Sequence, residues 1–210
     1  REQLAEKLGH NAVLMQLPIG LEDTLKGLVD LVEMKAYYYD GEEGQKVRVA
    51  EIPADLLPEA EKWRETLIDS LALLSDELTE AALEGKVTPE LLKKVVRQGT
   101  ISRKLLPVFM GSAYKDKGIQ TLLDAVVDYL PNPAEVENIA IDLDDNKPYV
   151  LSADPAAKTC VLAFKLEDGR YGQLSYLRVY QGTVSRGSEV TNTRTGQRVR
   201  LANSQRLFGR

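Results

Sequence analysis

The sequence LLPVFMGSAYKDKGIQTLLDAVVDYL, residues 105–130, combines a short apolar run, a Gly-Ser-Ala turn and an amphipathic repeat. The apolar run predicts a strand that is covered on both faces of an α/β sheet. The repeat predicts a helix that packs on this sheet through Ile119, Leu122, Leu123, Val126, Val127 and Leu130. The turn, Gly111–Ser112–Ala113, follows the carboxyl end of the strand, where open α/β sheets bind their ligands.

A second apolar strand is predicted at residues 11–17, and the residues between the two strands have a different character. Residues 25–39 and 46–52 predict a small antiparallel sheet. The arrangement indicates an α+β subdomain, residues 21–104, inserted into an α/β domain that includes residues 1–20 and 105–131.

The helices of the predicted insertion are marked by spacing and by capping residues. Apolar residues recur at helical spacing from Pro53 to Gly85, with Ser75 as a candidate cap of a second segment. Thr88 and Pro89 predict the start of a third helix, which we expect to end near Gln98, before Gly99. A helix is also predicted at residues 1–8, without a preceding cap or starting Met, so we expect a fragment of a longer protein.

The composition changes after the central helix. Residues 132–157 are polar and contain several prolines, which predicts a linker. From residue 158 apolar residues alternate and glycine turns recur, so residues 158–210 predict part of a small all-β sandwich or barrel.

Composition and charge limit the class of protein. The 210 residues are 43% hydrophobic and 28% charged, without an apolar run that approaches a membrane span, so we expect a cytoplasmic protein that does not contact a membrane. With one Cys and one His, no zinc site is expected. Residues 159–210 hold nine Lys and Arg against three acidic residues, which leaves 18 basic and 29 acidic residues elsewhere out of totals of 27 and 32. This asymmetry suggests that the end of the chain meets phosphate, although a solvated charged face explains it equally well.

The Gly-Ser-Ala turn can supply a backbone N–H to the carbonyl of a guanine base without a mobile side chain. Any strand-to-helix turn also favours small residues, so the string alone leaves a structural explanation open. The chain contains no phosphate-binding G-x-x-x-x-G-K-[ST] loop, and Asn146-Lys147 lacks the aspartate that would bind the guanine ring. No catalytic Ser/His/Asp, paired-carboxylate or metal constellation is present in the sequence.

Several strings occur in the order and spacing of a known family: NAVLMQLPIG, KGLVDLVEMKA, EIPADL, FMGSAYKDKGIQTLLDAVVDYLPNP, LAFKLEDGRYGQLSYLRVYQGTVSRG and NTRTGQRVRL. On these strings the chain resembles bacterial and organellar elongation factor G, a translational GTPase. The last two strings look most like the mitochondrial type and its bacterial relatives. The resemblance implies the C-terminal part of a P-loop GTPase domain (1–20 and 105–131) with an α+β insertion (21–104), a linker (132–157) and part of a β-barrel second domain (158–210).

The resemblance also implies a function for the longer protein, which binds GTP or GDP with Mg²⁺ and moves tRNA and mRNA on the ribosome. Gly111, Ser112 and Ala113 match the last guanine-contacting motif of the family, and Lys115 follows closely. The phosphate loop, both switches and the other guanine motif would lie before Arg1. We therefore expect no catalytic or metal-binding residue here, no GTP hydrolysis and no bound nucleotide.

Two partner surfaces follow from the resemblance and agree with the charge asymmetry. The acidic helix around residues 56–74 is expected to contact the stalk protein of the large ribosomal subunit. The barrel is expected to contact small-subunit ribosomal RNA, with Arg178, Arg186, Arg194, Arg198 and Arg200 as candidates for phosphate contacts. We expect a monomer. The alternatives are a GTPase similar to peptide-chain release factor three and a non-catalytic module that binds RNA and protein.

Overall fold

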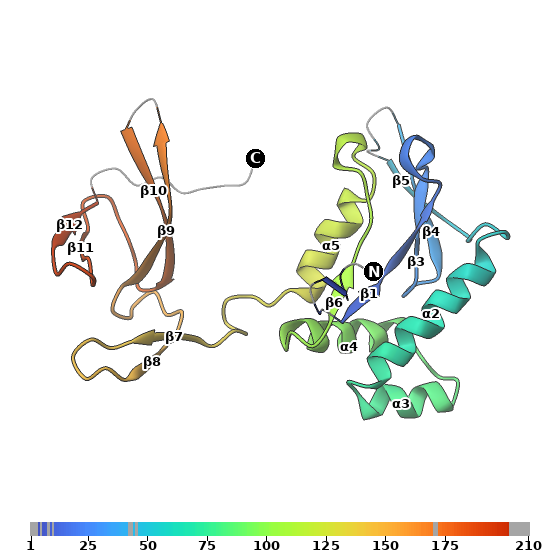
Figure 1. Cartoon of the computed structure of the whole chain (residues 1–210), viewed down its shortest axis with the longest axis horizontal. Coiled ribbons are helices and arrows are strands. Elements are labelled where there is room, and N and C mark those ends of the chain that lie inside the picture. Colours follow the sequence, from blue (N-terminus) through green and yellow to red (C-terminus); the bar gives the residue numbers. More distant parts are fainter. Residues whose placement is uncertain are drawn as a thin grey trace. The chain divides into compact units, whose positions relative to one another are not determined.

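The computed structural model describes Leu4, Glu6, Lys7, Gly9, residues 11–41, Gly44, and residues 46–169 and 172–201. Of the helix predicted at residues 1–8, Leu4, Glu6 and Lys7 are described and are helical. The end of the predicted barrel, residues 202–210, lies outside the described residues. The chain forms two compact units, residues 1–130 and 131–210 (Figure 1).

The first unit contains the strand, turn and helix that the sequence predicted. Strand β1 (Ala12–Leu14) pairs in parallel with β6 (Leu106–Val108), with Val13 opposite Pro107. A 3-10 turn, η2 (Ala113–Lys115), and helix α5 (Ile119–Tyr129) follow β6. Because parallel strands need a long crossover connection, the intervening residues can form a subdomain of their own.

Met15 divides the apolar run at residues 11–17, which was predicted as one strand, into two. Its N–H donates to the carbonyl oxygen of Val108 at 3.0 Å, and its own carbonyl accepts from the N–H of Leu31 at 3.0 Å. The chain beyond it, β2 (Gln16–Ile19), pairs with the insertion instead of with β6. One residue therefore joins two sheets.

The sheet of the insertion has four antiparallel strands in the order β2-β3-β4-β5. Its other strands are β3 (Gly27–Asp30), β4 (Lys35–Asp40) and β5 (Lys46–Ala50), and the 3-10 turn η1 (Glu22–Thr24) connects β2 to β3. The small antiparallel sheet predicted from the sequence is confirmed. It gains a strand, β2, that the sequence analysis had placed in the surrounding domain.

Three helices complete the insertion: α2 (Leu57–Ala72), α3 (Asp76–Leu83) and α4 (Pro89–Ile101). The predicted caps are confirmed, because the Ser75 side chain accepts from the N–H of Leu78 and the Thr88 side chain accepts from the N–H of Leu91. Pro89 occupies the first position of α4, where its missing N–H costs nothing.

The predicted end of α4 before Gly99 is wrong, since the helix continues to Ile101. Gly99 is buried within α4, and a Cβ there would lie 3.0 Å from Leu105 Cβ and 3.0 Å from Leu74 Cδ1. This glycine thus lets α4 approach its neighbours closely.

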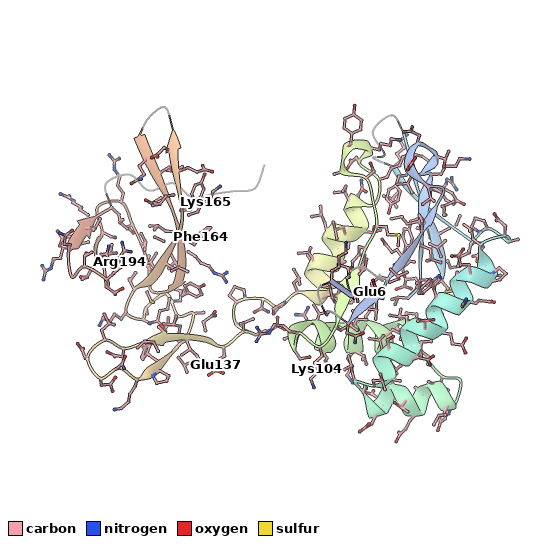
Figure 2. The ribbon with its side chains drawn as sticks, viewed as in Figure 1. Glu6, Lys104, Glu137, Phe164, Lys165 and Arg194 are labelled. Carbon is pink, nitrogen blue, oxygen red and sulfur yellow. The ribbon has the colours of Figure 1, made fainter. Side chains whose placement is uncertain are left out.

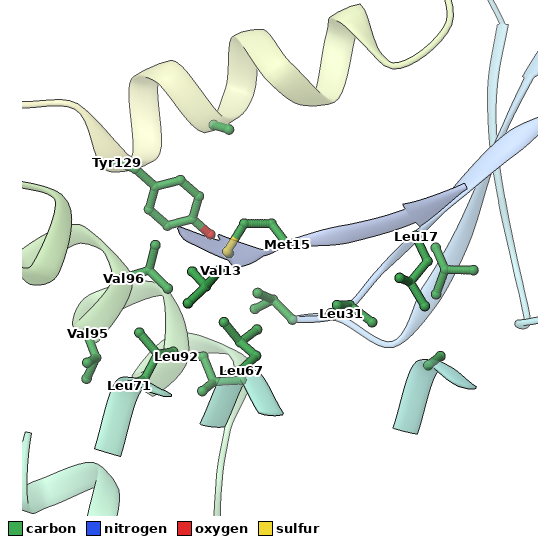
Figure 3. Packing of buried hydrophobic residues seen from close by; sticks show 14 of the residues in the cluster. Val13, Met15, Leu17, Leu31, Leu67, Leu71, Leu92, Val95, Val96 and Tyr129 are labelled. Carbon is green, nitrogen blue, oxygen red and sulfur yellow. The ribbon is translucent and has the colours of Figure 1, made fainter. Parts of the chain in front are cut away.

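The hydrophobic core lies between the parallel strands and the helices on either side (Figure 3). Val13 and Met15 are exposed by 2% or less and lie between Tyr129 of α5 and the leucines of α2 and α4. The predicted inner face of α2 and α3 is confirmed, because Ala60, Leu67, Leu71 and Leu78 are buried. The core of the surrounding domain and that of the insertion therefore form one cluster.

Helix α5 differs from the prediction in the face that it buries. Ala125 and Tyr129 are buried, whereas Leu123 and Val127 of the predicted stripe are 60% and 76% exposed. Leu106 of β6 is also exposed, so this strand is not covered on both faces. The apolar stripe predicted for α5 is thus only partly buried among the described residues.

The described residues of the second unit form three antiparallel hairpins. They are formed by β7 (Asn138–Ile141) with β8 (Pro148–Leu151), β9 (Cys160–Gly169) with β10 (Gly172–Gln181), and β11 (Glu189–Thr191) with β12 (Arg198–Arg200). From residue 158 onward, the described secondary structure consists of strands, as predicted. The predicted linker differs, because residues 138–151 form the first hairpin instead of an unstructured connection.

Leu71 and Leu73, two residues apart at the end of α2, provide a matched test of the core. Leu71 is fully buried, so Leu71→Ala is expected to lower the free energy of unfolding by about 2–5 kcal/mol. Leu73 is 86% exposed, so Leu73→Ala is expected to change it by about 0.5 kcal/mol or less. Urea unfolding measures both values, and equal losses in the two variants would contradict the described packing.

Candidate functional site

The loop between β6 and α5, residues 111–118, is closed by a pair of backbone hydrogen bonds. The N–H of Ser112 donates to the carbonyl oxygen of Lys117 at 2.8 Å, and the N–H of Lys117 donates to the carbonyl oxygen of Ser112 at 3.1 Å. A Cβ at Gly111 would lie 2.6 Å from the Lys117 carbonyl oxygen. Glycine at this position is therefore required for the loop to close.

The 3-10 turn η2 provides the candidate hydrogen-bond donor of this loop. The first N–H groups of a helix or 3-10 turn have no partner within it. Within the described part of the chain, the Ala113 N–H donates no hydrogen bond, and Ala113 is exposed. Because the Ser112 N–H is already bonded to Lys117, the donor predicted for a guanine carbonyl corresponds to Ala113.

The backbone at the end of the loop has a geometry that few residues adopt. Asp116 has φ of 49° and Gly118 has φ of 83°, both in the left-handed region. A Cβ at Gly118 would lie 2.6 Å from the Met110 carbonyl oxygen and 2.9 Å from Leu28 Cδ1. The loop is thus packed tightly on β6 and on the insertion.

Lys115, the fourth residue predicted at the site, extends its side chain toward the insertion. Its Nζ lies 2.9 Å from Asp23 Oδ1 and 3.5 Å from the carbonyl oxygen of Glu22. The hydrogen bond and the positive charge of Lys115 lower the pKa of the Asp23 carboxyl. Asp23 is fully exposed, so the ion pair is screened by water and contributes little stability.

Further contacts between the loop and the insertion involve residues that the sequence analysis did not identify. Lys117 Nζ donates to the carbonyl oxygen of Leu25 at 2.7 Å. Gly44 leaves no room for a Cβ, which would lie 2.8 Å from the Asp116 carbonyl oxygen. Buried Gln16 accepts from the N–H of Met110 at 3.3 Å. No local pattern identifies these residues, because their partners are 72 to 94 positions away along the chain.

Two of the candidate phosphate contacts lie on the last hairpin. Arg198 and Arg200 are exposed on β12, opposite Thr191 and Glu189 of β11. Because the two arginines are two residues apart on one strand, they lie on the same face of the hairpin. The structure therefore brings this pair together.

The other three candidates lie elsewhere in the second unit. Arg178 on β10 is placed over the ring of Tyr180, 4.9 Å from its centroid. Arg186 lies between β10 and β11, and Arg194 lies in the exposed turn between β11 and β12 (Figure 2). Arg178, Arg186 and Arg194 are all exposed, which a phosphate contact requires.

Lys165 and Phe164 of β9 add an aromatic and basic surface to the same unit (Figure 2). Lys165 Nζ lies 5.2 Å from the ring centroid of Tyr176, and Phe164 packs beside that ring at 6.3 Å between centroids. These residues were not selected from the sequence. The alternating apolar pattern that includes Phe164 was visible, but the pairing of Phe164 and Lys165 with Tyr176 across β9 and β10 depends on register.

The acidic residues of α2 and α3 form the exposed side of these helices. The exposed acidic residues are Glu59, Glu61, Glu65, Asp69, Asp76, Glu77 and Glu80. Leu73 and Leu83 are 86% and 85% exposed near the ends of the two helices. The insertion therefore presents an acidic surface with two uncovered leucines.

In the part of the chain that the structure describes, no group of three or more His, Cys, Asp or Glu residues is arranged to hold a metal ion. Its helices are each too short or too polar to span a membrane.

Comparison with known proteins finds extensive similarity to elongation factor G. The chain is 55% identical over 208 residues to elongation factor G 2 of Anaeromyxobacter dehalogenans strain 2CP-C. This alignment covers 99% of this chain and 30% of the relative. Elongation factor G 1 of Syntrophus aciditrophicus strain SB is 55% identical over 208 residues, and that of Treponema pallidum strain Nichols is 53% identical over 206 residues. Each of these two alignments covers 98% of this chain and 30% of the relative.

A solved structure supports the fold. The chain matches a crystal structure from Thermus thermophilus with a TM-score of 0.69 and 25% identity, over 95% of this chain and 27% of that one. No protein-family model matches the chain. The chain spans about 30% of the length of the curated relatives reported above, and over nearly all of its own length it is similar to one segment of elongation factor G.

Proposed function

We propose that this chain is part of a ribosome-dependent translational GTPase, elongation factor G, which promotes movement of tRNA and mRNA by binding and hydrolysing GTP. The observation that carries the proposal is the 50–55% identity to elongation factors G of several bacteria over 98–99% of this chain. The similarity includes the 111–118 loop, both strands that flank the insertion, and the second unit.

The loop is proposed to bind the guanine base of GTP or GDP. The exposed N–H of Ala113 fits a carbonyl acceptor, and the closed Ser112–Lys117 pair holds this donor in place. Gly111 permits the closed loop, and Lys115 is the last residue of the 3-10 turn that begins at Ala113. Bound GTP supplies the γ-phosphate and, with Mg²⁺, the chemistry of hydrolysis. The residues of this chain contribute base binding, and we assign them no catalytic role.

The proposed partners are two components of the ribosome, the stalk protein of the large subunit and the RNA of the small subunit. The exposed carboxylates around residues 56–74 fit a contact with the large-subunit stalk protein. The exposed arginines of the second unit fit small-subunit ribosomal RNA. We further propose that the longer protein is a cytoplasmic monomer of the mitochondrial-type branch. Its domains would be 1–20 with 105–131, 21–104, and 158–210 after a linker.

The alternatives are a factor similar to peptide-chain release factor three and a non-catalytic binding module. The relatives reported above are all named elongation factor G, so they support the main proposal over both alternatives.

The isolated chain is expected to show no measurable GTP hydrolysis and little affinity for guanine nucleotides. A micromolar dissociation constant requires about 8 kcal/mol of binding free energy. One backbone hydrogen bond from Ala113 contributes a net of only about 1 kcal/mol. Fluorescence anisotropy with labelled GDP measures the affinity, and micromolar binding to the 210-residue chain would contradict this expectation.

In the longer protein, Arg178→Glu, Arg194→Glu and Arg198→Glu are each expected to weaken ribosome binding. Each removed phosphate contact should also reduce the slope of log affinity against log salt concentration by roughly one. Lys104→Glu is a matched control, because it makes the same charge change at an exposed residue of the first unit. Sedimentation binding at several salt concentrations tests this, and unchanged binding at low salt would refute the RNA-facing assignment.

A further inference from the structure

Lys117 contacts both the proposed guanine-binding loop and the insertion. Its backbone makes both hydrogen bonds of the Ser112 pair, at 2.8 and 3.1 Å. Its side chain extends away from that pair, and Nζ donates to the carbonyl oxygen of Leu25 at 2.7 Å. Leu25 follows the 3-10 turn η1 and lies 92 positions earlier in the chain. One residue thus links the turn that presents Ala113 to the first turn of the insertion.

The surroundings of this link are well packed. Leu25 is 9% exposed and belongs to a small apolar cluster with Leu28 and Tyr39, against which Met110 packs. Met110 directly precedes the 111–118 loop, and Leu28 Cδ1 lies against Gly118. The Leu25 carbonyl therefore has a fixed position relative to the loop, and an ammonium bonded to it restricts where Lys117 can lie.

A second lysine, Lys115, links the same two segments through a weaker interaction. Lys115 pairs with Asp23, whose side chain is fully exposed, whereas the bond from Lys117 to Leu25 is partly buried. Exposed ion pairs contribute little to stability because water and salt screen them. A partly buried hydrogen bond from a charged donor is stronger, and its loss leaves the Leu25 carbonyl without that donor. Lys117 is accordingly the more important of the two.

We propose that Lys117 is a positioning residue for nucleotide binding, which holds the Ser112–Ala113 turn in its base-binding conformation by anchoring the loop to the Leu25 carbonyl of the insertion. The nucleotide part of this proposal rests on the function proposed above for the loop. Any displacement of the Leu21–Leu25 segment is transmitted through Lys117 to Ser112.

Amide hydrogen exchange on the 210-residue chain tests the anchoring directly. Lys117→Met removes the donor but keeps a long side chain. The exchange rates of the Ser112 and Lys117 amides should rise about tenfold, the effect of losing one charge-assisted hydrogen bond. Lys117→Arg should restore slow exchange. Lys26→Met is the matched control, because Lys26 is exposed beside Leu25 and its side chain makes no hydrogen bond within the described residues; it should leave both rates unchanged.

The exchange of Val29, a fully buried strand residue, reports whether a variant remains folded. If Lys117→Met exposes Val29, Lys117→Ala is used instead, because it also removes the donor and introduces no long apolar side chain. Unchanged Ser112 and Lys117 exchange in a folded variant overturns the proposal.

The nucleotide step is tested by the dissociation rate of labelled GDP from the longer protein. Lys117→Met should accelerate dissociation about as much as it accelerates loop exchange, and Lys117→Arg should reverse the effect. Faster loop exchange with unchanged GDP dissociation would overturn the role of Lys117 in nucleotide binding and, with it, the guanine assignment of the loop. Unchanged loop exchange would overturn only the anchoring by Lys117, so the two failures are distinguishable.

Discussion

The backbone of Met15 holds the first unit together. Its N–H donates to the carbonyl oxygen of Val108 in the parallel pair, and its carbonyl accepts from the N–H of Leu31 directly after β3, so one residue links two sheets. Its side chain is 1% exposed in the common core (Figure 3). The insertion is therefore not attached by a flexible connection, because its first strand continues directly from the parallel sheet. Gln16, the next residue, extends the link by accepting from the N–H of Met110 at the start of the 111–118 loop.

This continuity explains why the proposed nucleotide-binding loop and the proposed stalk-binding helices belong to one packed body. Helix α2 packs on β1, and the 111–118 loop packs on η1 and Leu28. Lys117, Lys115 and Gly44 add contacts between the loop and the insertion. The acidic helices and the loop are therefore connected by continuous packing through the core and through β2.

Features that depend on nearby residues were predictable from the sequence. The caps Ser75 and Thr88, the inner face of α2 and the strand-turn-helix order around Gly111 all follow from local spacing. Features that depend on distant partners were not. Gly99 looked like a helix end but is a packing site, because its neighbours Leu74 and Leu105 are known only from the fold. Lys117 resembled any loop lysine, since its acceptor is 92 positions away. The periodicity of α5 identified an apolar face, but part of this face is exposed. Periodicity alone therefore does not show which part of an apolar face is covered.

The central claim is that the Ala113 N–H of the longer protein binds guanine, and Ala113→Pro tests it by removing that N–H. Proline fits the first position of the 3-10 turn, and Ser112 before it already has the extended backbone that proline requires, with φ of −130° and ψ of 105°. Ala113→Gly keeps the N–H and is the control. Titration with labelled GDP should show a loss of about 1–3 kcal/mol for Ala113→Pro and little change for Ala113→Gly. Equal GDP affinity of the Ala113→Pro variant and the unaltered protein would contradict the account.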